Sequence, residues 1–140
     1  MKDLWPEEIQ SVRARPPVVI LEEQGALLGE KTKNLIRGRV REVESIHRRD
    51  FNFIFMLEAP SIRYSFSMLQ IRYGIKLYPV QVKPAEEIAD ELGWGKDDEW
   101  QGVQNEDDFS GLLSRVFRTQ CVRVLIAAIL AQVEHRIPEG

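Results

Sequence analysis

The chain has 140 residues, of which 44% are hydrophobic and 29% charged, and its formal net charge is −3 at pH 7. This size and apolar content suit a single domain with a sizeable core, which we expect to span residues 1–140. The lone cysteine excludes an internal disulfide, the N-terminus lacks the apolar segment of a signal peptide, and no apolar run approaches the roughly 20 residues of a membrane span, so we expect a cytoplasmic protein.

The N-terminal region is predicted to be helical. Pro6 followed by Glu7 and Glu8 is typical of a helix start, because proline suits the first helical position and acid suits the first turn. A proline pair then interrupts the chain, and a second helix is predicted from Pro17 to about Lys33. Its apolar side consists of Ile20, Leu21, Leu27 and Leu28.

The middle of the chain has the period-two pattern of strands. In the third strand the apolar alternation changes phase between Met68 and Leu69, which predicts a bulge or a bend. Pro79 lies inside the fourth strand and indicates an edge position or a bulge. Short links between consecutive strands predict an antiparallel meander. The four expected strands are residues 35–46, 51–57, 62–72 and 75–83.

The C-terminal region is predicted to be helical again. A short helix over residues 85–92 is followed by a polar loop from Trp94 to Gln104. Asn105 then caps a helix over residues 105–118, whose acidic first turn suits the positive end of the helix dipole.

The last predicted helix, residues 120–135, is apolar almost all round, with Thr119 as its cap. Such a helix is expected to be the central buried element, packed on the sheet near Phe53, Phe55 and Leu57. Whether it continues the preceding helix is left open. Together the elements predict an α+β fold, with a four-stranded antiparallel meander packed against N- and C-terminal helices.

Charge is sorted along the chain. Residues 31–83 carry eleven Lys and Arg against four Asp and Glu, whereas residues 84–140 carry five against twelve. Such asymmetry is typical of a basic binding surface, of an acidic binding surface, or of two regions that neutralise each other.

The basic option centres on a row of arginines. Arg37, Arg39 and Arg41 share one face of a strand, and Arg63 and Lys76 are candidates to join them in binding the phosphates of a nucleic acid or another polyanion. The competing interpretation pairs these cations with the acidic C-terminal region. We favour that interpretation, because the whole chain is acidic.

The acidic option centres on the loop around two tryptophans. A tryptophan flanked by carboxylates is a typical anchor at a protein interface, and here it would meet a basic partner. Alternatively both indoles fold back onto the domain, since tryptophan is usually mostly buried. The candidate partner-binding residues are Trp94, Asp97, Asp98, Glu99 and Trp100.

No catalytic, metal or cofactor motif is present, so no cofactor is expected. Cys121 has the setting of a buried apolar residue, and neither His47 nor His135 has a spaced Cys or His partner for a metal. A dyad of Cys121 with His135 is left open. We lean towards a protein that is not an enzyme.

Two runs, residues 20–34 (ILEEQGALLGEKTKN) and residues 74–80 (GIKLYPV), resemble a group of small bacterial proteins with no assigned activity. The resemblance implies a bacterial, cytoplasmic protein and brings no functional residue with it. From the residues themselves we expect a non-catalytic protein-binding module, similar to an antitoxin, an immunity protein or an adaptor, with a homo-oligomer as an open possibility. The alternatives are a nucleic-acid or polyanion binder using the basic strands, and an enzyme whose site assembles only in three dimensions.

Overall fold

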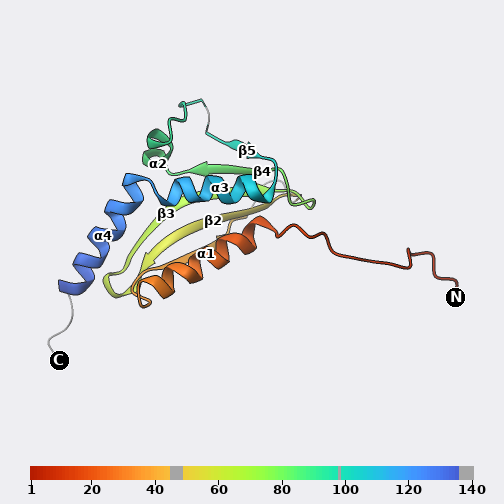
Figure 1. The fold of residues 1–140 in the computed structure, drawn as a ribbon, viewed down its shortest axis with the longest axis horizontal. Coiled ribbons are helices and arrows are strands. Elements are labelled where there is room, and N and C mark those ends of the chain that lie inside the picture. The colour runs from red at the N-terminus through yellow and green to blue at the C-terminus, as the bar shows by residue number, and fades with distance from the viewer. Residues whose placement is uncertain (45–48, 98, 136–140) are drawn as a thin grey trace.

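The computed structural model of the chain describes residues 1–44, 49–97 and 99–135. It is an α+β structure in which one antiparallel sheet has the strand order β1-β2-β3-β4-β5, so each strand lies beside its neighbour in sequence. Helices α1 and α3 lie side by side on one face of the sheet, and α4 runs across its end (Figure 1). The elements are α1 (Pro17–Lys31), β1 (Arg37–Glu42), β2 (Phe51–Ala59), the 3₁₀ turn η1 (Pro60–Ile62), β3 (Tyr64–Tyr73), β4 (Val80–Pro84), α2 (Glu86–Glu91), β5 (Gln101–Val103), α3 (Glu106–Phe117) and α4 (Gln120–His135).

The predicted class is confirmed, but the sheet has five strands rather than four. The additional strand, β5, was expected to be part of a polar loop, because three residues are too few to show an alternating pattern. It pairs with Val80, Gln81 and Val82, so β4 is an internal strand of the sheet. The prediction of a strand over residues 75–83 with Pro79 inside it, at an edge or a bulge, is therefore corrected: β4 begins at Val80, directly after Pro79, so the proline removes no hydrogen bond from the ladder.

The N-terminal region contains one helix. α1 begins at Pro17 as predicted, but the helix expected to start at Pro6 is absent, since residues 1–16 contain no helical residue. A short isolated helix is marginal in water, and these residues have no apolar surface of the same chain against them. Residues 45–46, the end of the first predicted strand, lie outside the described residues.

α1 meets the sheet through two glycines. A Cβ atom on Gly25 would lie 2.4 Å from the carbonyl oxygen of Gly38 in β1, and one on Gly38 would lie 2.6 Å from the ring of Phe55. The absence of a side chain at both positions lets the backbones of helix and strand touch. This close crossing places the apolar side of α1 directly on β1 and β2.

The phase change predicted in β3 is a β-bulge. Phe55 pairs with Leu69 and Met56 pairs with Ser67, so Met68 has no partner across the ladder. The additional residue places Met68 and Leu69 both in the core, each about 2% exposed or less. The apolar residues on either side of the bulge therefore face the same helices.

The expectation that α4 is the central buried helix is wrong. Only Val122, Ile129 and Val133 are buried, and Val124 is 54% exposed. Besides Val124, the outward face carries polar and charged residues such as Arg123, Gln132 and Glu134, together with the small residues Ala127, Ala128 and Ala131, which expose little apolar area. The place expected for α4 is taken by α3, whose Phe117 ring lies 5.8 Å from that of Phe55.

Helices α3 and α4 are separate and meet at a bend of 56°. No single helix among the described residues is long and apolar enough to cross a membrane, and these two reach that length and composition only when they are counted together across the bend. After the bend, α4 runs across the end of the sheet, so no described helix packs directly along the C-terminal half of α1 (Figure 1).

Both C-terminal helices are capped. Asn105 accepts a hydrogen bond from the Asp108 backbone at 2.8 Å, as predicted. Thr119 accepts only a long bond of 3.4 Å from Val122. The main cap of α4 comes from α2, because the Glu91 carboxylate accepts from the backbone nitrogens of Gln120 at 2.5 Å and Cys121 at 2.8 Å. This cap was not visible in the sequence, since its donor and acceptor are about 30 positions apart.

Candidate functional site

Three regions of the surface are candidates for a binding site: the sheet face that carries no helix, the tryptophan loop, and a groove beside α1. The first is built by β1 to β4. Gly38 faces α1, so by strand alternation Arg37, Arg39 and Arg41 point to the opposite face. Register places Arg72 and Lys83 on that same face, across from Asn52 and Gln70. The face therefore carries five cations.

Two of those arginines are partly neutralised within the sheet. Glu58 lies opposite Arg37 on the neighbouring strand, and its carboxylate is 3.7 Å from Arg37 and 3.3 Å from Arg39. Exposed pairs of this kind contribute little to stability, roughly 0–1 kcal/mol. They do lower the positive potential that an anionic ligand would meet.

The other two candidate cations do not join the row. Arg63 follows η1 in the turn that precedes β3, and Lys76 lies in the turn after β3. These turns are at opposite ends of a ten-residue strand. The predicted anion-binding set is therefore divided, with Arg37, Arg39 and Arg41 as its only members on one face.

The tryptophan loop lies against the same sheet face. The Arg72 guanidinium is 4.1 Å from the centre of the Trp100 ring, and the Lys83 ammonium is 5.8 Å from it. Glu99 forms an ion pair with Lys83 at 2.5 Å. Lys83 is thus paired with the acidic C-terminal region, whereas Arg37 and Arg39 pair with Glu58 of the basic segment itself, so the predicted pairing of the arginine row with the C-terminal region is wrong for these two. Trp100 is half-buried between the loop and the sheet.

The ion pair has a defined pH dependence. The hydrogen bond and charge of Lys83, together with the charge of Arg72, lower the pKa of Glu99. A carboxyl whose pKa is lower in the folded state contributes stability above its unfolded pKa and loses it as the pH falls through the folded value. The small contribution of this exposed ion pair is therefore fully present above the unfolded pKa of Glu99 and is lost as the pH falls through its folded pKa.

The second tryptophan also contacts the domain. Trp94 packs against the core, and its backbone nitrogen donates to Ala89 at the end of α2 at 3.0 Å. Asp97 is exposed, and the prediction for Asp98 lies outside the described residues. The role of the loop in binding a partner remains a prediction. Both of its tryptophan side chains already contact other parts of the chain.

We expect Trp100→Ala to lower the free energy of unfolding by about 1–2 kcal/mol, because the substitution removes a half-buried ring and its contact with Arg72. Urea denaturation followed by circular dichroism measures this. The control is Ile75→Ala, whose side chain is 76% exposed and which is expected to change stability by less than about 0.5 kcal/mol. Equal values for the two variants would show that Trp100 does not pack on the sheet.

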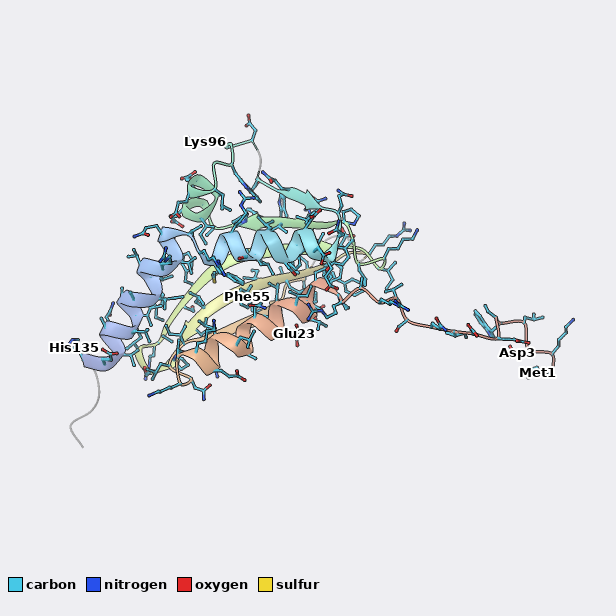
Figure 2. The ribbon with its side chains drawn as sticks, in the orientation of Figure 1. Met1, Asp3, Glu23, Phe55, Lys96 and His135 are labelled. Carbon is cyan, nitrogen blue, oxygen red and sulfur yellow. The ribbon has the colours of Figure 1, made fainter. Side chains whose placement is uncertain are left out.

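The third region is an apolar groove on the helical face. It has a volume of about 180 Å³ and opens between α1 and α4, with β2 and β3 as its floor. Phe55, at the centre of the molecule in Figure 2, lies on this floor. Its lining consists of Gln24, Leu27, Leu28, Lys31, Phe55, Leu57, Met68, Phe117, Val122 and Ile126.

The groove exists because of the bend between α3 and α4. α3 covers the sheet beside the first half of α1, and α4 turns by 56° to the end of the sheet, so no described helix packs directly along the second half of α1. Leu27 is left 43% exposed on the rim, although it belongs to the predicted apolar side of α1. Sequence reasoning missed the groove, and Leu27 and Leu28 were assigned only to the core.

Geometry also bears on the dyad that the sequence left open. Cys121 and His135 are both on α4, at opposite ends, and 14 positions along a helix correspond to about 21 Å. They are therefore too far apart to exchange a proton. Burial, with the nearby charges of Glu87 and Glu91, raises the pKa of Cys121, which keeps its thiol protonated. Among the described residues, no group of three His, Cys, Asp or Glu is placed to hold a metal.

Comparison of the chain with models of protein families, with curated proteins and with solved structures finds no match.

Proposed function

We propose that the protein is a non-catalytic protein-binding module and that the groove between α1 and α4 receives an apolar helical segment of its partner. The observation that carries this proposal is the lining of the groove: eight of its ten residues are apolar, and Leu27 and Leu28 leave water-exposed apolar surface on its rim. An amphipathic helix laid into an apolar groove is a common mode of protein recognition. A bacterial, cytoplasmic setting belongs to the same proposal and comes from the sequence alone.

The charge of the groove also indicates what kind of partner segment it would bind. Among the described residues that line the groove, Lys31 is the only charged one, and it lies at the C-terminal end of α1. A segment with apolar anchors and acidic flanks therefore suits the groove better than a basic one. This differs from the basic partner that the acidic loop predicts.

Selection from a displayed library of short helical peptides tests the proposal. We expect enriched peptides to carry apolar residues at positions i, i+4 and i+7, and to bind at least about tenfold more weakly to Leu27→Glu, because a charge on the rim must be desolvated. Ala26→Glu is the matched control, since Ala26 is an exposed neighbour on α1 that does not line the groove. Enriched peptides that bind both variants equally would contradict the proposal.

A second candidate function is polyanion binding by the sheet face that carries Arg37, Arg39, Arg41, Arg72 and Lys83. What favours it is that no helix among the described residues covers this face (Figure 1). The ion pairs with Glu58 and Glu99 and the net charge of −3 weigh against it. Salt-dependent binding of mixed-sequence DNA that Arg39→Glu abolishes would favour this function over the first.

A further inference from the structure

The first 14 residues form an N-terminal arm that lies away from the rest of the molecule. Figure 2 shows Met1 and Asp3 far from the sheet and helices, at the end of an extended chain. Four large apolar side chains on this arm are between 70% and 84% exposed. Apolar surface of this kind on an exposed segment is typical of a site that binds another protein. The four residues are Leu4, Trp5, Ile9 and Val12.

The arm is attached to the folded part of the molecule at Arg15. The Arg15 side chain forms ion pairs with Glu23 of α1 and Glu106 of α3, and its carbonyl oxygen accepts a hydrogen bond from the Tyr78 hydroxyl at 3.1 Å. Burial raises the pKa of Tyr78 to about 12, so its hydroxyl remains a donor throughout the neutral range. Pro16 is extended, with φ −56° and ψ 142°, and the chain before it runs away from the sheet and the helices (Figure 1).

The arm has the pattern of the segment that the groove is proposed to receive. Trp5, Ile9 and Val12 are spaced i, i+4 and i+7, so they align on one side of a helix. Pro6, Glu7 and Glu8 follow the tryptophan as proline and acid do in a helix start. The sequence therefore favours a helix that the isolated arm cannot maintain, and docking of its apolar side would stabilise it.

The charge of the arm and the size of its tryptophan side chain also match the groove. The arm, residues 1–14, carries three carboxylates against Lys2 and Arg13, a net charge of −1, whereas Lys31 is the only charged residue among the described residues that line the groove. A volume of about 180 Å³ is large enough for an aromatic ring system, since an engineered cavity of about 150 Å³ in another protein binds benzene. Trp5 is the largest apolar group on the arm and the one that best fills such a space.

We propose that the N-terminal arm docks in the groove of a second copy of this chain, with Trp5 inserted between α1 and α4, to form a dimer by reciprocal exchange of arms. The inference rests on the proposed function, because it assigns an occupant to the same groove. The arm leaves α1 at Pro17, and the groove lies beside the other half of α1. Two α1 helices related antiparallel by a two-fold axis therefore place each arm near the partner's groove, which closes the assembly at two copies.

Sedimentation of the full chain over roughly a hundredfold range of concentration tests this inference. We expect the wild-type chain to dimerise, and Trp5→Ala and Leu27→Glu each to raise the dissociation constant of the dimer by roughly 30-fold or more. Gln10→Ala and Ala26→Glu are the matched controls, on the arm outside the apolar stripe and on α1 outside the groove, and are expected to dimerise like the wild type. Both test positions are exposed, so the variants are expected to fold.

Mixing the two deficient variants gives a sharper result. Trp5→Ala retains an intact groove and Leu27→Glu retains an intact arm, so an equimolar mixture is expected to form a heterodimer that neither variant forms with itself. A wild-type monomer at every concentration, or a dimer that Trp5→Ala does not weaken, overturns the inference. If either of these results is found while the selected peptides still bind more weakly to Leu27→Glu, the exchange of arms is contradicted. The proposed function of the groove is then still supported.

Discussion

Phe55→Ala is expected to lower the free energy of unfolding by about 3–5 kcal/mol. The Phe55 side chain is 2% exposed and lies between the sheet and the helices, with its ring 5.8 Å from that of Phe117. Truncation would leave a cavity where α1, α3 and the sheet meet, because the backbone contact at Gly25 and Gly38 prevents the layers from closing over it. Urea denaturation measures the loss.

Phe51→Ala is the matched control on the same strand. Phe51 is 39% exposed and its ring packs 5.5 Å from Tyr73, so we expect its truncation to cost about 1 kcal/mol. A cost below about 1 kcal/mol for Phe55→Ala would mean that this residue is not the centre of the core.

Gly25→Ala is expected to destabilise the protein by about 1–3 kcal/mol or more, although alanine is the better helix former by nearly 1 kcal/mol. The added Cβ would lie 2.4 Å from the Gly38 carbonyl oxygen and 2.9 Å from its carbon, and neither atom is part of a flexible side chain. α1 would have to move away from β1, which would loosen the contacts of Ile20 and Leu21 with the sheet. Thermal and urea denaturation both measure the change.

Gly111→Ala in α3 is expected to change the stability of the protein in the opposite direction. A Cβ atom at Gly111 meets no atom within 4 Å, so the substitution is expected to stabilise the protein by about 0.5–1 kcal/mol. If Gly25→Ala were stabilising as well, the close crossing of α1 and β1 would not exist in solution.

Local sequence patterns were sufficient for most of the fold. The proline start of α1, the Asn105 cap of α3 and the alternation of β2 were each predicted at the positions where the structure has them, because each depends on interactions within a few residues. The bulge in β3 was also predicted, since an additional residue changes the phase of the apolar pattern wherever the strand is placed.

The predicted pairing with the acidic C-terminal region is wrong for Arg37 and Arg39, which pair with Glu58, and it is seen among the described residues of the basic strands for Lys83. A basic middle and an acidic C-terminal region indicate that the two attract each other, and Lys83 does pair with Glu99. The partner of each arginine was not predictable, because Arg39 finds Glu58 only through the register of β1 with β2. Arg63 and Lys76 were grouped with that row although the turns of the meander separate them.

Tertiary structure alone decided the features on which function depends. The strand β5 forms because β4 offers it an edge, the α4 cap comes from Glu91 of another helix, and the bend between α3 and α4 moves α4 from the centre of the sheet to its end. These features depend on contacts between residues far apart in the chain, and periodicity carries no information about such contacts. The groove is the consequence: Leu27 has the pattern of a core residue, and only the direction of α4 leaves it exposed for a partner.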